Sequence, residues 1–315
     1  MKKILRNILR VILIVITVIA LFVIISLVRH KVCSSREKDL LTPLGELVEV
    51  NGHKMSVYTE GDGYKTLVFM SGSGTCSPIL DKSLYSLLSN DYKIVVVEKF
   101  GYGFSDVVDE NRDIDTMLSE TRMALDKAGI KGPYVLCPHS MSGLEALYWV
   151  QKYPEEVEAI VGLDMAVPDY YDEMNINIPI MKLGQYGAAL GITRWIPSLA
   201  ESDAIKAGTL SEKEKEIYRA VFYQKTATVT MIDEVKAVKQ NANIVKENGI
   251  PQVPMLLFIS DGSGGTGFTK EKWRSIPENY ISDCDNASYI ELDCPHYVHD
   301  YKYDEISKEI RKFIQ

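Results

Sequence analysis

A serine lies in a tight turn between a short apolar run and a helical pattern. The apolar run is residues 134–137, the turn at residues 138–143 has the sequence Pro-His-Ser-Met-Ser-Gly, and residues 144–150 have helical periodicity. A strand that turns at once into a helix presents the side chain of the turn outward, and here that side chain is Ser140. The N-terminus of the following helix favours negative charge beside the hydroxyl. The segment therefore predicts a strand–turn–helix unit that exposes a serine oxygen.

Strand and helix patterns alternate on both sides of this turn. Apolar runs that predict strands lie at residues 66–70, 93–98, 134–137, 158–164, 254–259 and 287–292. Helical patterns lie at residues 78–88, 115–128, 144–150 and 304–313. Residues 46–58 alternate around Asn51-Gly52, a pair that predicts a hairpin. The alternation predicts an α/β fold, with a mostly parallel sheet and helices on both of its faces.

The alternation stops over residues 167–248. Helical patterns in this segment lie at residues 180–189, 212–223 and 229–247, with no strand pattern between them. An all-helical insertion between two sheet strands indicates a cap over the carboxyl ends of the strands, where open α/β sheets bind ligands. We therefore divide the folded part of the chain into a core, residues 44–166 and 249–315, and a helical cap, residues 167–248.

The N-terminal segment is apolar enough to cross a membrane. Residues 11–28 carry no charge and have about the length that a helix needs to span a bilayer. Basic side chains precede this run at Lys2, Lys3, Arg6 and Arg10. The positive-inside rule then places residues 1–10 in the cytoplasm. We expect a single-pass cell-membrane protein with a transmembrane helix at 11–28, a linker at 29–43, and an extracytoplasmic folded domain.

A cleaved signal peptide is the competing interpretation of this segment. The apolar run is long for a signal peptide, and no small-x-small cleavage site follows it. These features favour an uncleaved anchor, and whether the segment is cleaved stays open.

Charge and cysteine content argue against several classes of partner. The formal net charge is −8, and no basic stretch outside the N-terminus could neutralise phosphates, so we expect no nucleic-acid partner. Five cysteines are not a disulfide framework; Cys284 and Cys294 could pair outside the cell, and free thiols explain them equally well. The five histidines lack ligand spacing, so we predict no metal. The Gly-rich segments match no complete nucleotide-binding motif, so we predict no cofactor.

Four motifs resemble those of the α/β-hydrolase superfamily and occur in its order. They are Ser-Gly-Ser-Gly at 71–74, Gly-Tyr-Gly-Phe-Ser-Asp at 101–106, the turn at 138–143, and Cys-Pro-His at 294–296. From about residue 44 to the C-terminus the chain therefore resembles an α/β-hydrolase with a helical cap. It departs from the usual pattern at Ser71, where the superfamily has His, and at Pro138 and Ser142, where it has Gly.

The resemblance implies a serine mechanism. Ser140 matches the nucleophile and His296 matches the base, while the backbone N–H groups of Met141 and Ser73 match the oxyanion hole. A serine hydroxyl is a weak nucleophile at neutral pH, so it needs a base within hydrogen-bond reach and a third group that orients the base.

Two aspartates compete for the role of orienting acid. Asp261 follows the predicted strand at 254–259, the commonest position of the acid in the superfamily, and we favour it. Asp164 ends an earlier strand, where some lipases of this fold carry their acid. His299 lies about one helical turn beyond His296 and competes with it as base, whereas we expect His139 to be a packing residue.

The sequence thus predicts a membrane-anchored serine hydrolase that cleaves an ester of a small molecule through an acyl-enzyme at Ser140. An amide or an N-terminal peptide bond is a possible substrate because capped peptidases share the fold. The alternatives are a catalytically weak binding or sensing protein at the membrane, which the departures at 71, 138 and 142 motivate, and an acyltransferase.

Overall fold

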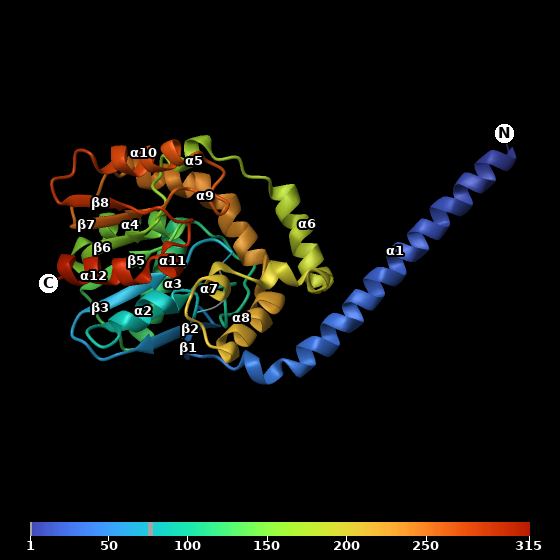
Figure 1. Cartoon of the computed structure of the whole chain (residues 1–315), viewed down its shortest axis with the longest axis horizontal. Coiled ribbons are helices and arrows are strands. Elements are labelled where there is room, and N and C mark those ends of the chain that lie inside the picture. The colour runs from blue at the N-terminus through green and yellow to red at the C-terminus, as the bar shows by residue number, and fades with distance from the viewer. Residues whose placement is uncertain (1, 75–77) are drawn as a thin grey trace.

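The computed structural model describes residues 2–74 and 78–315. Its centre is an eight-stranded sheet in the order β1-β2-β4-β3-β5-β6-β7-β8 (Figure 1). Its strands are β1 (Glu46–Val50), β2 (His53–Glu60), β3 (Thr66–Met70), β4 (Lys93–Glu98), β5 (Tyr134–Pro138), β6 (Val157–Leu163), β7 (Met255–Ile259) and β8 (Ala287–Glu291). All pairs from β4 across to β8 are parallel, and β1 and β2 form an antiparallel hairpin at the other edge. The predicted mostly parallel sheet is confirmed.

Helices cover both faces of this sheet. They are α2 (Lys82–Leu88), α3 (Ile114–Lys127), α4 (Ser142–Lys152), α10 (Lys270–Ile281), α11 (Val298–Tyr301) and α12 (Tyr303–Phe313), with a short η2 (Pro154–Glu156) before β6. In β3, Leu67 and Phe69 pack with α2 and α12, whereas Val68 and Met70 pack with α3 and α4. Successive side chains of a strand point to opposite faces, so each central strand contributes to both cores. Strands buried on both faces are typical of parallel sheets.

An all-helical segment connects β6 to β7, and we call it the cap. It contains α5 (Tyr170–Glu173), α6 (Ile178–Ala189), η3 (Ile192–Trp195), η4 (Pro197–Ala200), α7 (Asp203–Lys206), α8 (Glu212–Lys225) and α9 (Val229–Glu247). Hydrogen bonds of Asn241 on α9 connect the cap to the core, because its side chain accepts from Ile114 N (3.0 Å) and donates to Arg112 O (3.1 Å). Asn241 is buried, so these two bonds fix α9 against the start of α3.

The N-terminal helix α1 (Lys2–Arg36) projects from the rest of the molecule (Figure 1). It is long and apolar enough to cross a membrane, although a signal sequence near an N-terminus passes the same test of length and composition. The predicted linker at 29–43 is largely helical, since α1 continues to Arg36 and η1 (Lys38–Leu41) follows. The helix continues past its apolar run because its last turns pack against the cap.

Candidate active site

Ser140 occupies a strained turn between β5 and α4. Its φ of 53° lies in the left-handed region, which costs a residue with a side chain about 1–3 kcal/mol and persists only where the surroundings enforce it. The Ser140 carbonyl accepts hydrogen bonds from Gly143 N (3.0 Å) and Ala166 N (2.8 Å). A Cβ on Gly143 would lie 2.2 Å from Ala166 O, so only glycine lets α4 begin this close to the loop after β6.

The two departures from the superfamily pattern at this turn have local explanations. Pro138 is the last residue of β5, opposite Met70 of β3, and the next residue resumes the ladder with His139 N donating to Met70 O (2.9 Å). Ser142 is buried, and its hydroxyl lies within hydrogen-bond distance of Met70 O (2.6 Å) and His139 O (2.8 Å). The Ser142 hydroxyl therefore ties the turn to β3 instead of leaving a buried polar atom unpaired.

A carboxylate holds His296 at the carboxyl ends of the parallel strands, where the Ser140 turn also lies. His296 Nδ1 donates to Asp164 Oδ2 at 2.5 Å, and Asp164, directly after β6, is only 3% exposed. A carboxylate on Nδ1 fixes the imidazole tautomer and leaves Nε2 unprotonated, which is the state a general base requires.

Three further donors fix the carboxylate of Asp164. It accepts from Ser260 N (2.7 Å), Ser260 Oγ (2.6 Å) and Trp273 Nε1 (3.0 Å). Asp164 has a φ of 52°, so both Asp164 and Ser140 adopt left-handed backbone. Hydrogen bonds to the charged form stabilise a buried carboxylate and hold it in one orientation toward His296.

The structure does not bring Asp261, which the sequence analysis favours as the acid, to His296. Its carboxylate accepts a hydrogen bond from Ser263 N (2.8 Å), and its own N–H donates to Cys294 O (3.0 Å). The backbone of the following loop has positive φ at Gly262, Gly264, Gly265 and Gly267. Asp261 therefore closes a local turn at the start of this loop, and Asp164 replaces it as the candidate acid.

Two other histidines surround His296 without taking its place. His139 donates from Nε2 to His296 O (3.3 Å), and the two rings lie 4.6 Å apart. Burial and the nearby imidazoles hold the pKa of His139 well below its usual value, so it stays neutral. His299 is fully buried with Nε2 3.3 Å from Asp81 Oδ1, and burial lowers its pKa to about 3. These contacts make His139 a support for the backbone of His296 and leave His299 without access to a substrate.

The backbone N–H groups predicted for an oxyanion hole have no acceptor among the described residues. Within the described parts of the chain, neither Ser73 N nor Met141 N donates to a described residue. Gly72 brings the first loop close to the serine, because a Cβ at Gly72 would lie 2.7 Å from Ser140 Cβ. Met141 is the N-cap of α4, whose dipole favours an anion at this position. Both groups are thus available to stabilise negative charge beside Ser140.

Ser140 and His296 do not form a hydrogen bond with each other. Among the hydrogen bonds of residues 2–74 and 78–315, none joins Ser140 Oγ to a ring nitrogen of His296. Such catalytic contacts are often long in ligand-free enzymes and tighten when substrate binds.

A buried ion pair lies beside the nucleophile loop, and the sequence analysis did not find it. Lys99, just after β4, pairs with Glu234 of α9, and Tyr102 Oη donates to the same carboxylate (2.5 Å). Two very small cavities of about 10 Å³ each adjoin Lys99, and they are also lined by Met141 and Ser71 respectively. Because Lys99 belongs to the core and Glu234 to the cap, the pair connects the two parts next to the candidate site.

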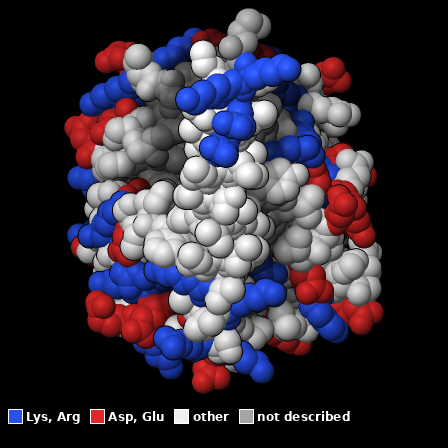
Figure 2. Space-filling view, turned by 90° about the vertical axis from the view of Figure 1, so that its right-hand side faces the viewer, with Lys and Arg blue, Asp and Glu red and all other residues white. Residues whose placement is uncertain are grey.

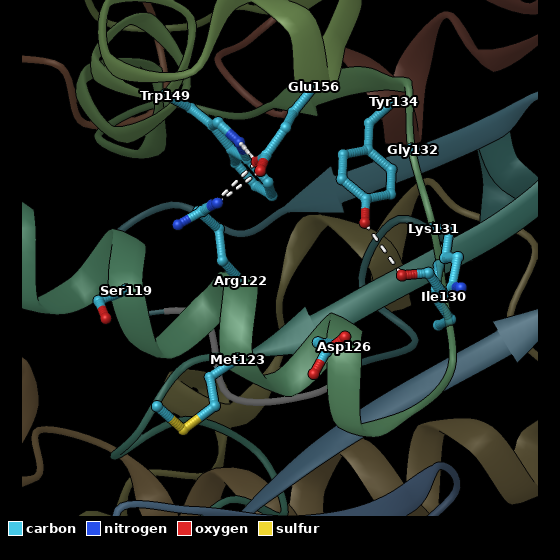
Figure 3. A pocket seen from close by; sticks show the side chains of 10 residues that line it. All are labelled: Ser119, Arg122, Met123, Asp126, Ile130, Lys131, Gly132, Tyr134, Trp149 and Glu156. Carbon is cyan, nitrogen blue, oxygen red and sulfur yellow. Dashed lines mark hydrogen bonds and ion pairs between the residues drawn. The ribbon is translucent and has the colours of Figure 1, made fainter.

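A larger groove lies away from this chemistry. It has a volume of about 450 Å³ between α3 and the start of β5, and Figure 3 shows its lining residues, including Arg122, Tyr134 and Glu156. Glu156 pairs with Arg122 and accepts from Trp149 Nε1 (2.8 Å), so the carboxylate and the guanidinium at this end of the groove already bind each other. Tyr134 begins β5, whereas Ser140 follows its end. The groove and the serine therefore lie at opposite ends of this strand.

Among the described residues, the cysteines and possible metal ligands form no further site. Cys284 and Cys294 are free thiols, and Cys76 lies outside the described residues. Within residues 2–74 and 78–315, no three His, Cys, Asp or Glu side chains are grouped so that they could hold a metal ion.

Solved structures with this architecture are α/β-hydrolase-fold enzymes. An enol-lactonase from Burkholderia xenovorans has a TM-score of 0.63 at 15% identity, over 85% of this chain and 99% of that structure. A variant epoxide hydrolase from Bacillus megaterium has a TM-score of 0.66 at 16% identity, over 85% and 99%. The chain therefore has the α/β-hydrolase fold, as the sequence motifs predict.

Sequence relatives define the family more narrowly. The uncharacterized protein YbdG of Bacillus subtilis is 35% identical over 99% of both chains, so this chain belongs to the same family as YbdG. A cis-3-alkyl-4-alkyloxetan-2-one decarboxylase from Shewanella oneidensis is 23% identical over 84% of this chain and 86% of that protein. No model of a known protein family matches the sequence.

Proposed function

We propose that this protein is a membrane-anchored serine hydrolase that cleaves an ester or an amide of a small molecule through an acyl-enzyme at Ser140. The observation that carries the proposal is the buried hydrogen bond between His296 Nδ1 and Asp164, at the sheet edge where the Ser140 turn follows β5. A base with a fixed tautomer beside an outward-turned hydroxyl is the arrangement that nucleophilic catalysis by serine needs.

Each step of the reaction uses groups already described. Ser140 Oγ attacks the acyl carbonyl while His296 Nε2 takes the hydroxyl proton, and Asp164 stabilises the imidazolium. The N–H groups of Ser73 and Met141 donate to the tetrahedral oxyanion. His296 then returns the proton to the leaving alcohol or amine. Water, deprotonated by the same imidazole, hydrolyses the acyl-enzyme and releases a carboxylic acid.

Cyclic esters belong in the substrate panel for this protein. The oxetan-2-one named in one relative is a four-membered lactone, and one structural neighbour is an enol-lactonase. Ring opening by Ser140 would keep acid and alcohol in one product, so lactones and open esters test the same acyl step.

The anchor is α1. Its uncharged run at 11–28 follows a basic N-terminus, which favours a cytoplasmic N-terminus and an extracytoplasmic catalytic domain in the cell membrane. The substrate would then be met outside the cytoplasm.

Hydrolysis by two alanine variants tests the proposal. Ser140→Ala removes the nucleophile and should abolish turnover of short-chain nitrophenyl esters and lactones above the level of the uncatalysed reaction. Ser73→Ala is the matched control: it also removes a hydroxyl beside the site but keeps the backbone donor, so it should retain most of the activity. Equal activity in wild type and Ser140→Ala would refute the serine mechanism.

The lack of a hydrogen bond between Ser140 and His296 favours a second candidate, a hydrolase-fold protein that binds a ligand with little turnover. Saturable ligand binding, with no turnover of any ester, amide or lactone by wild type, would support this alternative. Transfer of the acyl group to an added alcohol or amine in place of water would identify an acyltransferase with the same residues.

A further inference from the structure

The cap exposes a group of large apolar side chains on one side. Ile180, Leu183 and Tyr186 of α6 are 65%, 71% and 62% exposed. Their spacing of three residues places them along one face of the helix. Trp195 of η3, Leu199 of η4 and Ile196 between these two short helices are also exposed. We call these residues the cap face: Ile180, Leu183, Tyr186, Trp195, Ile196 and Leu199. Folded soluble domains rarely leave an apolar group of this kind uncovered.

The cap face adjoins the apolar part of α1. Trp195 donates from Nε1 to Ser26 Oγ (2.8 Å), and its ring lies 5.7 Å from that of Phe22. The guanidinium of Arg29 lies 4.4 Å above the same indole. On the other side of η3, a Cβ at Gly191 would lie 2.4 Å from His30 Cβ, so the backbones approach closely there. Trp195 therefore belongs both to the cap face and to the surface that contacts α1.

A buried arginine fixes this contact. Arg194 is 4% exposed and binds Glu37 with both terminal nitrogens (2.7 and 2.6 Å), while its Nε donates to His30 Nδ1 (2.9 Å). Its guanidinium also lies 4.4 Å above the ring of Tyr223 on α8. A buried, bidentate arginine pair is geometrically specific, so the end of α1 is held on the cap in a defined position rather than connected by a free linker.

The contact sets the depth of the cap relative to a bilayer. The uncharged run at 11–28 forms about 27 Å of helix, close to the ~30 Å hydrocarbon core. Phe22 and Ser26 lie inside this run, within about 9 Å of its end. A side chain that touches them, as Trp195 does, lies at the boundary between hydrocarbon and headgroups. Tryptophan is typical of that boundary.

The other residues of the cap face lie on the same side of the domain as the contact between Trp195 and α1. Figure 1 shows α6 on the side of the domain from which α1 departs. Figure 2 views this side with α1 extending toward the viewer and shows uncharged side chains across the middle of the face. The exposed apolar side chains of α6 and those of α1 therefore lie on one side of the molecule.

We infer that the cap face inserts into the outer leaflet of the phospholipid bilayer, so that the domain lies against the membrane instead of standing away from it. The inference rests on the proposed anchor, because the depth of Trp195 follows from α1 crossing the bilayer. The occupant is the lipid surface, since the cap face is continuous with the lipid-facing part of α1.

Photo-crosslinking from two tyrosine positions tests this inference. Tyr186 of the cap face and Tyr64, which is 89% exposed in the β2–β3 loop, are each replaced by p-benzoylphenylalanine in the full chain. The proteins are reconstituted in vesicles of phosphatidylcholine and phosphatidylglycerol and irradiated. We expect a mass increase of one phospholipid for position 186 and none above the unirradiated background for position 64. No lipid adduct at 186, equal adducts at both positions, or a crosslink from 186 to a second copy of the chain would overturn the inference.

Two further readouts on the same samples separate this inference from the proposed function. Retention of the chain in the vesicles after an alkaline carbonate wash tests the anchor, and labelling by a fluorophosphonate tests the serine. A retained, labelled chain without an adduct at 186 refutes lipid contact by the cap face alone. An adduct at 186 in a chain that carbonate removes supports the lipid contact and refutes the anchor.

Discussion

Four donors converge on the carboxylate of Asp164, from His296, Trp273 and both the backbone and hydroxyl of Ser260. Among the described residues, four that are not glycine have a positive φ, and Asp164 and Ser140 are two of them. Strain that persists at two positions of one site indicates that surrounding contacts enforce it. The alternative acid, Asp261, has no contact of this kind with His296.

Substitution of each aspartate by asparagine distinguishes the two acids. Asp164→Asn keeps the shape and tolerates the left-handed backbone, but its amide no longer holds the correct imidazole tautomer. We expect kcat/KM for an ester substrate to fall roughly 10³–10⁴-fold. Asp261→Asn is the matched control and should stay close to wild type. A large loss in Asp261→Asn with an active Asp164→Asn would reverse the assignment.

Glu98 gives a test of stability against pH. It is buried beside the Gly101–Asp106 turn, and burial raises the pKa of its carboxyl from 4.5 to about 8. Between these two values the folded chain holds a proton that the unfolded chain lacks. Raising the pH therefore weakens the folded state, by up to about 1.4 kcal/mol per pH unit. The stabilisation of the folded state by protonated Glu98 is complete below pH 4.5 and is lost by about pH 8.

Thermal unfolding from pH 5 to pH 8 measures this effect. Glu98→Gln removes the titrating group, so we expect the Tm of wild type to fall more steeply with rising pH than that of the variant. Glu49→Gln, at an exposed position of β1, is the control and should keep the wild-type slope. Parallel curves for wild type and Glu98→Gln would contradict the pKa shift.

At the scale of elements, the cap is attached to the core through α9. Glu234 pairs with Lys99 of the core, and both side chains are less than a tenth exposed. Removal of one partner of a buried pair leaves the other charge without compensation, which costs about 3–5 kcal/mol. The loss is larger than for an exposed pair because water cannot replace the missing partner.

Two neighbouring alanine substitutions on α9 test this contribution. Glu234→Ala should lower the free energy of unfolding by roughly 3–5 kcal/mol. Asp233→Ala breaks only the surface pair with Lys236, so it should cost about 0–1 kcal/mol. Denaturant titration of the full chain in detergent micelles measures both. Equal losses in the two variants would show that the Lys99–Glu234 pair does not hold the cap.

The order of the elements was predictable because it depends on local patterns. The parallel strands, the hairpin at Asn51-Gly52 and the helical insertion each follow from periodicity and turn residues within a few positions. The partner of His296 was not predictable in this way. Asp164 and Asp261 both lie at the ends of strands. Only Asp164 accepts hydrogen bonds from Ser260 and Trp273, and Trp273 is about a hundred residues from Asp164 in sequence. Trp273 has no motif that could indicate its role.

At the scale of the whole molecule, the N-terminal helix was predictable from its local pattern, whereas its long-range contacts were not. Its length and lack of charge were evident in the sequence, but the contacts of Arg194 and Trp195 with its last turns required the folded cap. These contacts give α1 a fixed orientation relative to the core. The predicted linker therefore forms a docked helix end, and the domain has a defined side toward which α1 extends (Figure 1).

The central claim is that Ser140 is the nucleophile, and covalent labelling tests it most directly. The full chain in detergent is treated with a fluorophosphonate, and the adduct is located by peptide mass spectrometry. We predict one adduct per chain on Ser140, prevented in Ser140→Ala and slowed in Asp164→Asn. An unlabelled wild-type chain, or an adduct elsewhere that persists in Ser140→Ala, would contradict the account.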